Sequence, residues 1–243
     1  MPRLVILQHL QREGPGLFSI IAREFGIDIS VYRLDKSSQL PIISDIDSLL
    51  ILGGPMSVMD RDKSKYLWID NEINLIKQVL LKQIPFVGVC FGAQLLAYAS
   101  GGNVETLITE EKRVNPEVGW SPVFPLHPQP DEPLLEYLKE PMQVLHWHED
   151  RILLPKSASL LASSSRCREQ LFRIGPNAYG LQFHAEIYGD MVEEWIREDS
   201  EFIYQAMGRD ARSVLYEQQR EFCLSSHRNR MDFLRGLFAQ LFP

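Results

Sequence analysis

One stretch decides the expected fold: Gly88-Val89-Cys90-Phe91-Gly92-Ala93-Gln94. The apolar run 84–87 before it is typical of a buried strand, and the apolar run 95–99 after it is typical of a helix. Cys90 is therefore predicted to lie on a sharp turn between a strand and a helix. Small residues two positions before and after a nucleophile permit such a turn and expose the nucleophilic side chain. The alternative is a buried, unreactive cysteine, but this does not explain a glycine on each side.

Strand and helix patterns alternate on the N-terminal side of this stretch. Apolar runs at 4–7, 27–34 and 47–52 predict strands, and helical spacing of apolar residues predicts helices at about 17–25 and 66–83. Such alternation favours an α/β fold, in which helices cover both faces of a parallel sheet and ligands bind at the carboxyl ends of the strands.

The pattern changes after Gly101-Gly102. The strands predicted between residues 104 and 183 are short and have no helices between them, so we expect antiparallel additions to the sheet edge. Beyond Glu186 the apolar spacing is helical, and we expect these helices to pack on the sheet and to carry no chemistry.

The composition excludes several classes of protein. The chain has 243 residues, of which 45% are hydrophobic and 23% charged, and this fits one sizeable α/β domain. Its net charge of −7 and its lack of a basic stripe argue against a nucleic-acid partner. No apolar run approaches the ~18 residues of a membrane-spanning helix, so we expect a cytoplasmic protein without membrane attachment. The three cysteines are too widely spaced for a disulfide framework or a zinc site.

A cysteine nucleophile needs a basic partner, and that partner needs a group that orients it. His184 follows the strand pattern 179–183 and should lie at the same sheet edge as Cys90. Glu186 is two residues further on, and residues i and i+2 of an extended chain project to the same side. We therefore predict a connected row of Cys90, His184 and Glu186. The alternative is an exposed histidine that lies near a glutamate by chance.

Acyl transfer also needs hydrogen-bond donors for the oxygen that becomes negative, and losing one such donor costs on the order of 3 kcal/mol of barrier. The backbone of Gly53-Gly54-Pro55 can approach a ligand closely, and we choose the Gly54 amide as one donor. The Phe91 amide, at the start of the expected helix, is the second. Taken alone, the glycine pair would also fit a simple turn.

These motifs together resemble the class I glutamine amidotransferase domain. The resemblance covers about residues 1–190 and points to stand-alone members similar to GMP synthase. It implies a flavodoxin-like open mixed sheet with helices on both faces for a catalytic domain at 1–190, and a helical extension at 191–243 packed on the same domain. The segments that carry it, besides the Cys90 stretch, are Gly53-Gly54-Pro55, Val118-Gly119-Trp120, Trp147-His148-Glu149-Asp150, Gly180-Leu181-Gln182-Phe183-His184 and His184-Ala185-Glu186.

The resemblance implies hydrolysis of a γ-glutamyl amide through a thioester on Cys90, without a cofactor. Ammonia or an amine leaves first, and water then releases glutamate. His184 would act as base and acid, Glu186 would orient it, and Gly54 with Phe91 would form the oxyanion hole. The amino and carboxylate ends of the substrate would be held by Gln94 and by the backbone of Trp147, Glu149 and Asp150.

One position departs from the family pattern, which usually reads His-Pro-Glu. Ala185 stands where the proline would fix the backbone between the base and its orienting group. We expect Ala185 to leave Glu186 less constrained, with more effect on efficiency than on the type of reaction.

A metal site is a competing interpretation of the segment 146–150. His146 and His148 lie two residues apart beside carboxylates, as ligands of a divalent ion could. No third ligand cluster is apparent in the sequence, and the family resemblance explains the segment without an ion. We therefore predict no metal site and no cofactor.

Three functions stay open at this point. The first is a glutamine-hydrolysing amidotransferase subunit, or glutaminase-like hydrolase, whose ammonia would need an acceptor on a separate synthase subunit. The second is a free-standing γ-glutamyl peptidase or hydrolase that acts on small γ-glutamyl compounds, and the third is a non-catalytic metabolite-binding module. DJ-1-like and PfpI-like proteins share the cysteine turn, but they lack the His-x-Glu pair together with Gln94.

Overall fold

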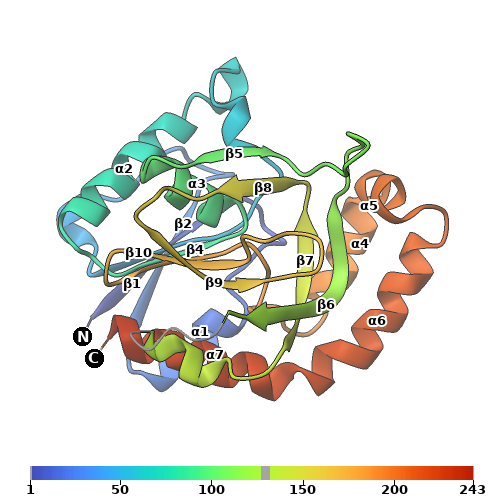
Figure 1. The fold of residues 1–243 in the computed structure, drawn as a ribbon. Helices are drawn as coiled ribbons and strands as arrows, with labels where there is room; N and C mark the ends of the chain where they lie inside the picture. The colour runs from blue at the N-terminus through green and yellow to red at the C-terminus, as the bar shows by residue number, and fades with distance from the viewer. Residues whose placement is uncertain (1, 127–131, 243) are drawn as a thin grey trace.

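The computed structural model describes residues 2–126 and 132–242. Within these residues, nine strands form one mixed sheet in the order β2-β1-β3-β4-β11-β10-β9-β6-β7, and β5 pairs with β8 in a separate two-stranded sheet (Figure 1). The strands are β1 (Arg3–Gln8), β2 (Asp28–Arg33), β3 (Ser48–Ile51), β4 (Phe86–Val89), β5 (Asn103–Thr106), β6 (Glu117–Pro125), β7 (Met142–His148), β8 (Asp150–Leu153), β9 (Ala158–Ser163), β10 (Leu171–Ile174) and β11 (Ala178–Leu181).

The parallel part of the sheet follows the apolar runs of the sequence. Strands β2, β1, β3 and β4 are parallel neighbours, as the alternation of strands and helices predicts. The apolar run at the start of the chain is buried on both faces: Leu4 and Ile6 belong to one hydrophobic cluster, and Val5 and Leu7 belong to another. A strand covered on both sides needs a continuous apolar run rather than an alternating one.

The later strands correct two expectations. β10, β9, β6 and β7 are antiparallel additions, as expected, but β11 pairs parallel with β4. Strand length and connection type do not reveal this pairing, because the chain forms the antiparallel strands at one side of the sheet before β11 returns to its centre. In addition, β5 does not join the main sheet, since Asn103–Thr106 pairs only with β8.

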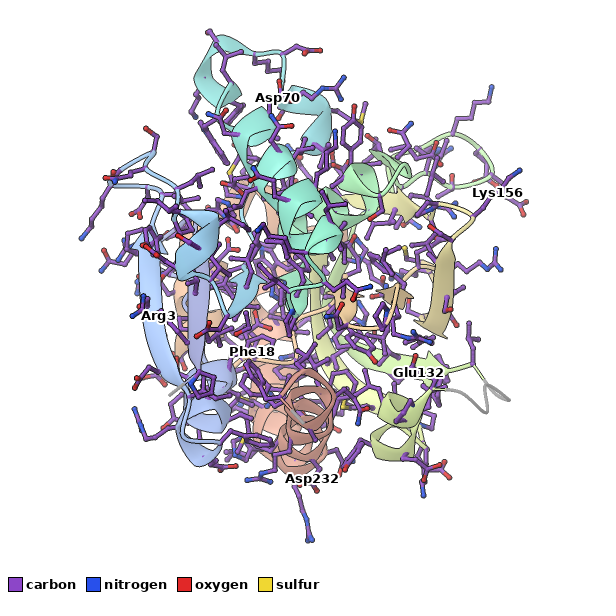
Figure 2. All side chains as sticks on the ribbon, turned by 90° about the vertical axis from the view of Figure 1, so that its left-hand side faces the viewer. Arg3, Phe18, Asp70, Glu132, Lys156 and Asp232 are labelled. Atoms are coloured by element: carbon purple, nitrogen blue, oxygen red, sulfur yellow. The ribbon has the colours of Figure 1, made fainter. Side chains whose placement is uncertain are left out.

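Helices cover both faces of the sheet (Figure 1). α1 (Leu17–Glu24) and α7 (His227–Leu241) pack on one face, where Phe18 is completely buried and close to Phe238. α2 (Ile69–Leu81) and α3 (Phe91–Ala99) pack on the other face. In Figure 2, Phe18 lies inside the molecule, whereas Asp70 and Lys156 lie at its periphery. The expected α/β architecture with helices on both faces is therefore confirmed.

The C-terminal helices form a third hydrophobic cluster beside β6 and β7. They are α4 (Met191–Glu198), α5 (Ser200–Met207) and α6 (Ala211–Ser225), and their apolar faces meet Trp120 and Trp147. Their division from the first 190 residues as a separate extension stays a prediction. In the described part of the chain, no helix has the length and apolar character needed to cross a membrane.

Candidate active site

Cys90 lies on the predicted turn between β4 and α3. Its backbone has φ 52° and ψ −108°, an unfavourable conformation for a residue with a side chain, and its N–H donates a 2.7 Å hydrogen bond to Leu181 O. A Cβ atom on Gly88 would lie 2.4 Å from Gly92 O, and one on Gly92 would lie 2.1 Å from Ile51 O. Both glycines are therefore required by the close backbone contacts of the turn.

His184 and Glu186 follow β11 at the same edge of the sheet. His184 Nδ1 and Glu186 Oε1 are 2.7 Å apart, so the imidazole donates to the carboxylate. A Cβ atom on Gly53 would lie 3.2 Å from His184 Cε1 and 3.5 Å from Cys90 Cβ, so the ring and the cysteine side chain border the same point. The three distant segments thus meet at one rim, with Cys90 and His184 in the wall of one pocket and Glu186 behind the ring.

The surroundings of His184 favour its protonated form. The ring is buried, and burial by itself lowers the pKa of His184, but the interactions with Glu186 and Cys90 outweigh this effect. The net result raises the pKa of His184 well above its ordinary value of 6.5.

The pocket beside Cys90 has a volume of about 490 Å³. It is lined by five more of the residues proposed for the site: Gly54, Gln94, Trp147, Glu149 and Asp150. The Cys90 thiol donates to Trp147 O across 3.9 Å, which brings the backbone of the 147–150 segment to the sulfur. Phe91 is buried as the first residue of α3, where helix geometry leaves the N–H without an intrahelical acceptor.

The backbone around Glu186 is held by two helices. Arg230 of α7 is completely buried, and its Nη1 donates to Ala185 O at 3.0 Å and to Ile187 O at 2.5 Å. The Leu17 N–H at the start of α1 donates to Glu186 O at 2.8 Å. This approach requires Gly16, which has φ 46° and on which a Cβ would lie 2.1 Å from Glu186 O. External hydrogen bonds therefore fix the segment in which Ala185 replaces the usual proline.

His9 is a residue that the sequence did not single out. It follows β1, and its Nδ1 donates to Gly53 O at 2.9 Å while Nε2 lies 3.2 Å from Glu72 Oε2. Burial lowers the pKa of His9, but Glu72 more than compensates, so the pKa is raised above 6.5. The ring also meets the edge of Phe91, with centroids 5.2 Å apart. His9 thus links both segments that carry the expected oxyanion-hole amides.

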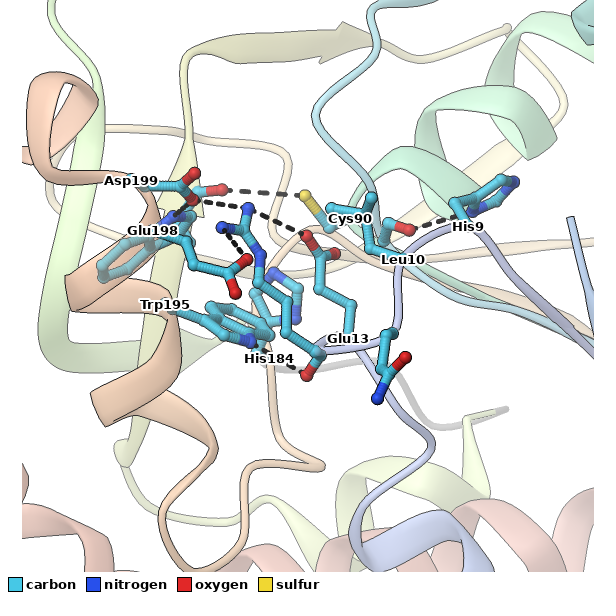
Figure 3. A network of polar contacts seen from close by, with 12 residues as sticks. His9, Leu10, Glu13, Cys90, His184, Trp195, Glu198 and Asp199 are labelled. Carbon is cyan, nitrogen blue, oxygen red and sulfur yellow. Dashed lines mark hydrogen bonds and ion pairs between the residues drawn. The ribbon is translucent and has the colours of Figure 1, made fainter. Parts of the chain in front are cut away.

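A polar network from the loop after β1 also reaches the pocket, and it too was missed (Figure 3). Arg12 and Glu13 line the pocket together with Asp199, which lies between α4 and α5. Arg12 Nη2 donates to Asp199 Oδ2 at 2.7 Å and lies 3.6 Å from Glu13 Oε1. The expectation that the C-terminal helices only pack on the sheet is therefore too narrow, because Asp199 and Phe202 border the pocket.

Three buried side chains beside the pocket could hold a metal ion. Glu117 supplies the third ligand that the sequence did not reveal, and its carboxylate lies within 4.8 Å of a nitrogen of His146 and of His148. Two of these side chains also have partners other than an ion: His148 Nδ1 donates to Asp150 O at 2.8 Å, and Gln170 donates to Glu117 Oε2 at 2.7 Å. Burial lowers the pKa of His146 to about 4. The prediction of no metal here stays a prediction.

Comparisons with known proteins agree on one family. The family model for the class I glutamine amidotransferase domain matches residues 20–198. The glutamine amidotransferase-like protein YfeJ of Salmonella typhimurium is 29% identical over 228 residues, which are 90% of this chain and 93% of that protein. The glutamine-hydrolysing GMP synthase of Christiangramia forsetii is 31% identical over 169 residues, which are 68% of this chain but only 29% of that enzyme.

A solved structure is similar over the full length of the chain. The glutamine amidotransferase of Thermotoga maritima superimposes with a TM-score of 0.82 and 26% identity. The match covers 100% of this chain and 99% of that one, so the neighbour has counterparts of the C-terminal helices.

Proposed function

The chain belongs to the class I glutamine amidotransferase family, and from this we propose that it hydrolyses a γ-glutamyl amide, with glutamine as the leading substrate. Cys90 is the proposed nucleophile, His184 the acid and base, and Glu186 the group that orients His184. The observation that carries the proposal is the meeting of Cys90 and His184 at one pocket, with Glu186 hydrogen-bonded to the far side of the ring.

The proposed reaction has two steps. The Cys90 thiolate attacks the γ-carbonyl carbon, and the carbon–nitrogen bond breaks as the His184 imidazolium gives its proton to the leaving nitrogen. This leaves a thioester on Cys90 and a neutral imidazole. Water then attacks the thioester and gives a proton to His184 as the carbon–sulfur bond breaks. Glutamate is released, and the thiolate and imidazolium are restored.

The two expected oxyanion donors stay part of the proposal. The Gly54 amide belongs to a loop that His9 holds through Gly53, and the Phe91 amide starts α3, where the helix dipole favours negative charge. We assign the contacts with the amino and carboxylate ends of the substrate to Gln94 and to the backbone of Trp147, Glu149 and Asp150. All four residues border the pocket.

The proposal is tested by trapping the thioester. Mass spectrometry of the protein after mixing with a γ-glutamyl substrate should find one added γ-glutamyl group, located at Cys90. The Cys90→Ala variant should lose both the adduct and glutamate release, whereas Cys167→Ser, which changes a cysteine away from the pocket, should keep both. An adduct at another residue, or full activity of Cys90→Ala, would disprove the assignment.

A second candidate is a free-standing γ-glutamyl hydrolase that releases an amine rather than ammonia. The pocket favours this candidate, because about 490 Å³ lies in the range of sites for larger ligands and Asp199 and Phe202 extend its wall. Turnover of γ-glutamyl amines without turnover of glutamine would select it. If glutamine is hydrolysed, a separate synthase subunit that accepts the ammonia is the implied partner. A cytoplasmic location, without nucleic acid or membrane, stays our prediction.

A further inference from the structure

We propose that Glu13 and Asp199 form a subsite for the leaving group, and that this leaving group is an amine with a second positive charge. The substrate class would then be γ-glutamyl conjugates of diamines or longer polyamines. This inference rests on the proposed function, because a leaving amine exists only if Cys90 is acylated. It follows from the charge, burial and position of the loop after β1 and of the junction between α4 and α5.

The first observation is that Asp199 is built firmly into the pocket wall. Its Oδ2 accepts hydrogen bonds from Arg12 Nη2 at 2.7 Å and from Trp147 Nε1 at 2.9 Å. Arg12 is in turn fixed by Trp195, whose Nε1 donates to Arg12 O at 3.1 Å. A carboxylate held on two sides does not need to be ordered again when a ligand binds, so it can recognise a ligand at low entropic cost.

The second observation is that Glu13 lacks matching partners. Its residue is only 8% exposed, yet it lines the pocket, and its ion-pair partner Arg12 is 3.6 Å away. In residues 2–126 and 132–242, no group donates a hydrogen bond to the Glu13 carboxylate. Buried carboxylates normally accept such bonds, so Glu13 has acceptor capacity left for a ligand.

The third observation is the charge balance of this wall. The Arg12 guanidinium pairs with three carboxylates, those of Glu13, Glu198 and Asp199, and the His184 ring adds a second positive charge that acts on Glu13, so the carboxylates still outnumber the cations. Burial raises the pKa of Glu13 and so disfavours its charged form, whereas the positive charges of His184 and Arg12, like that of an entering ammonium group, favour it. An ammonium group that enters here would meet the opposite charge, whereas the carboxylate of an amino-acid or peptide leaving group would meet like charge.

The position of Glu13 identifies which end of the substrate it faces. A Cβ atom on Gly53 would lie 2.5 Å from Glu13 Oε2 and 3.2 Å from His184 Cε1, and Figure 3 shows the Glu13 carboxylate on the side of Cys90 where His184 lies. The leaving nitrogen must face His184 to receive its proton. Its substituent therefore runs along Glu13 toward Asp199, past Phe202, which provides an apolar surface for methylene groups.

The test compares three substrates of equal length. They are γ-glutamylputrescine, whose chain ends in an ammonium group, γ-glutamylpentylamine, which ends in a methyl group, and the γ-glutamyl conjugate of aminopentanoate, which ends in a carboxylate. We expect kcat/KM to be highest for the ammonium and lowest for the carboxylate. The ammonium substrate should exceed the methyl substrate by at least about tenfold, as a charge-assisted hydrogen bond provides.

Glu13→Gln keeps the shape of the side chain and removes its charge, so it should reduce that preference to about twofold or less. If Glu13→Gln does not fold, Asp199→Asn provides a second measurement of the ratio of kcat/KM between the ammonium and methyl substrates. Glu201→Gln is the matched control, because Glu201 is an exposed acid on α5 that does not line the pocket, and its preference should equal that of the wild type.

The possible failures are distinguishable. If Cys90 is acylated but the ammonium substrate has no advantage, or if Glu13→Gln and Asp199→Asn both keep the advantage, the subsite is disproved and the proposed function stands. If the carboxylate substrate is the fastest, the subsite is also disproved and γ-glutamyl peptides become the substrate class. If no γ-glutamyl compound acylates Cys90, the proposed function fails, and the subsite fails with it.

Discussion

Arg230 donates hydrogen bonds to the carbonyl oxygens on both sides of Glu186. Its Nη1 reaches Ala185 O and Ile187 O, and its Nη2 reaches Cys223 O at 2.8 Å within the C-terminal helices. In the described part of the chain, no carboxylate forms an ion pair with the Arg230 guanidinium. The charge of nearby Glu186 nevertheless acts on it and favours its charged form. A helix far from the Cys90 turn in sequence thus holds the backbone of the residue whose carboxylate accepts a hydrogen bond from His184.

The Arg230 contacts predict a linked loss of stability and activity. Lysine keeps the charge but cannot form the same fork of hydrogen bonds, so Arg230→Lys should lower the free energy of unfolding by about 2–4 kcal/mol and lower kcat. Chemical denaturation and steady-state kinetics measure the two effects. Arg228→Lys is the control, because the Arg228 side chain is 91% exposed on the same helix. Lower stability with an unchanged kcat would show that Arg230 supports only the fold.

The raised pKa of His184 predicts how stability depends on pH. Because the folded pKa lies above the unfolded value, the imidazolium stabilises the fold fully below pH 6.5, and this contribution is lost as pH rises through the folded pKa. The stability difference between wild type and His184→Gln should therefore shrink as pH rises above 6.5.

Two variants check that origin of the pH dependence. Glu186→Gln should remove most of it, because Glu186 is the strongest of the interactions that raise the pKa of His184. His227→Gln should give the opposite trend in a different range, since burial lowers the pKa of His227: its stability difference should grow as pH rises toward 6.5 and stay constant above it. A stability difference for His184→Gln that does not change with pH would contradict the ion pair.

Gly16 predicts a specific steric effect on the site. Gly16→Ala should strain the backbone at φ 46° and also push a methyl group against Glu186 O. Gly26→Ala is a matched control, because Gly26 has φ 66° but open space around it, so it should show only the backbone cost of about 1–2 kcal/mol. Gly16→Ala should therefore be the less stable variant and should also lower kcat. Equal losses in thermal unfolding, with normal activity of both variants, would show that the contact with Glu186 does not matter.

Cys90 and Cys167 should differ in reactivity toward iodoacetamide. Burial raises the pKa of the Cys167 thiol to about 12, so this residue should stay unmodified in the folded protein at neutral pH. Cys90 borders the pocket and lies beside His184, so it should be alkylated first, with loss of activity at the same rate. Peptide mapping by mass spectrometry locates the label. Modification of Cys167 before Cys90 would contradict this order.

The parts of the candidate site whose geometry the sequence predicted are those that depend on neighbouring residues. The glycines around Cys90 and the His184–Glu186 spacing each describe a turn or an extended pair, and such geometry follows from a few neighbouring residues. The Arg12–Asp199 and Arg230–Ala185 contacts join residues 187 and 45 positions apart. Polar residues of this kind have no periodic pattern, so only the folded chain reveals that they meet.

The same reasoning explains the errors in the sheet. The length of a short strand does not determine which strand it pairs with. The parallel pairing of β11 with β4 depends on how the antiparallel strands before it are arranged in the sheet. Similarly, the third member of the Glu117–His146–His148 group lies on a different strand from the two histidines. Sequence spacing reveals possible ligands that lie on the same strand, but it does not reveal a ligand that lies on the neighbouring strand.

The positive φ at Cys90 places thermal stability in conflict with the presence of a cysteine side chain at this position. That backbone shape suits glycine alone, and a residue with a side chain there costs roughly 1–3 kcal/mol. The Cys90→Gly variant should consequently have a higher melting temperature than Cys90→Ala, whereas glycine is usually the more destabilising of the two residues. Selection for thermal stability alone would thus favour replacement of Cys90 by glycine. Any such selection must therefore measure turnover as well as melting temperature.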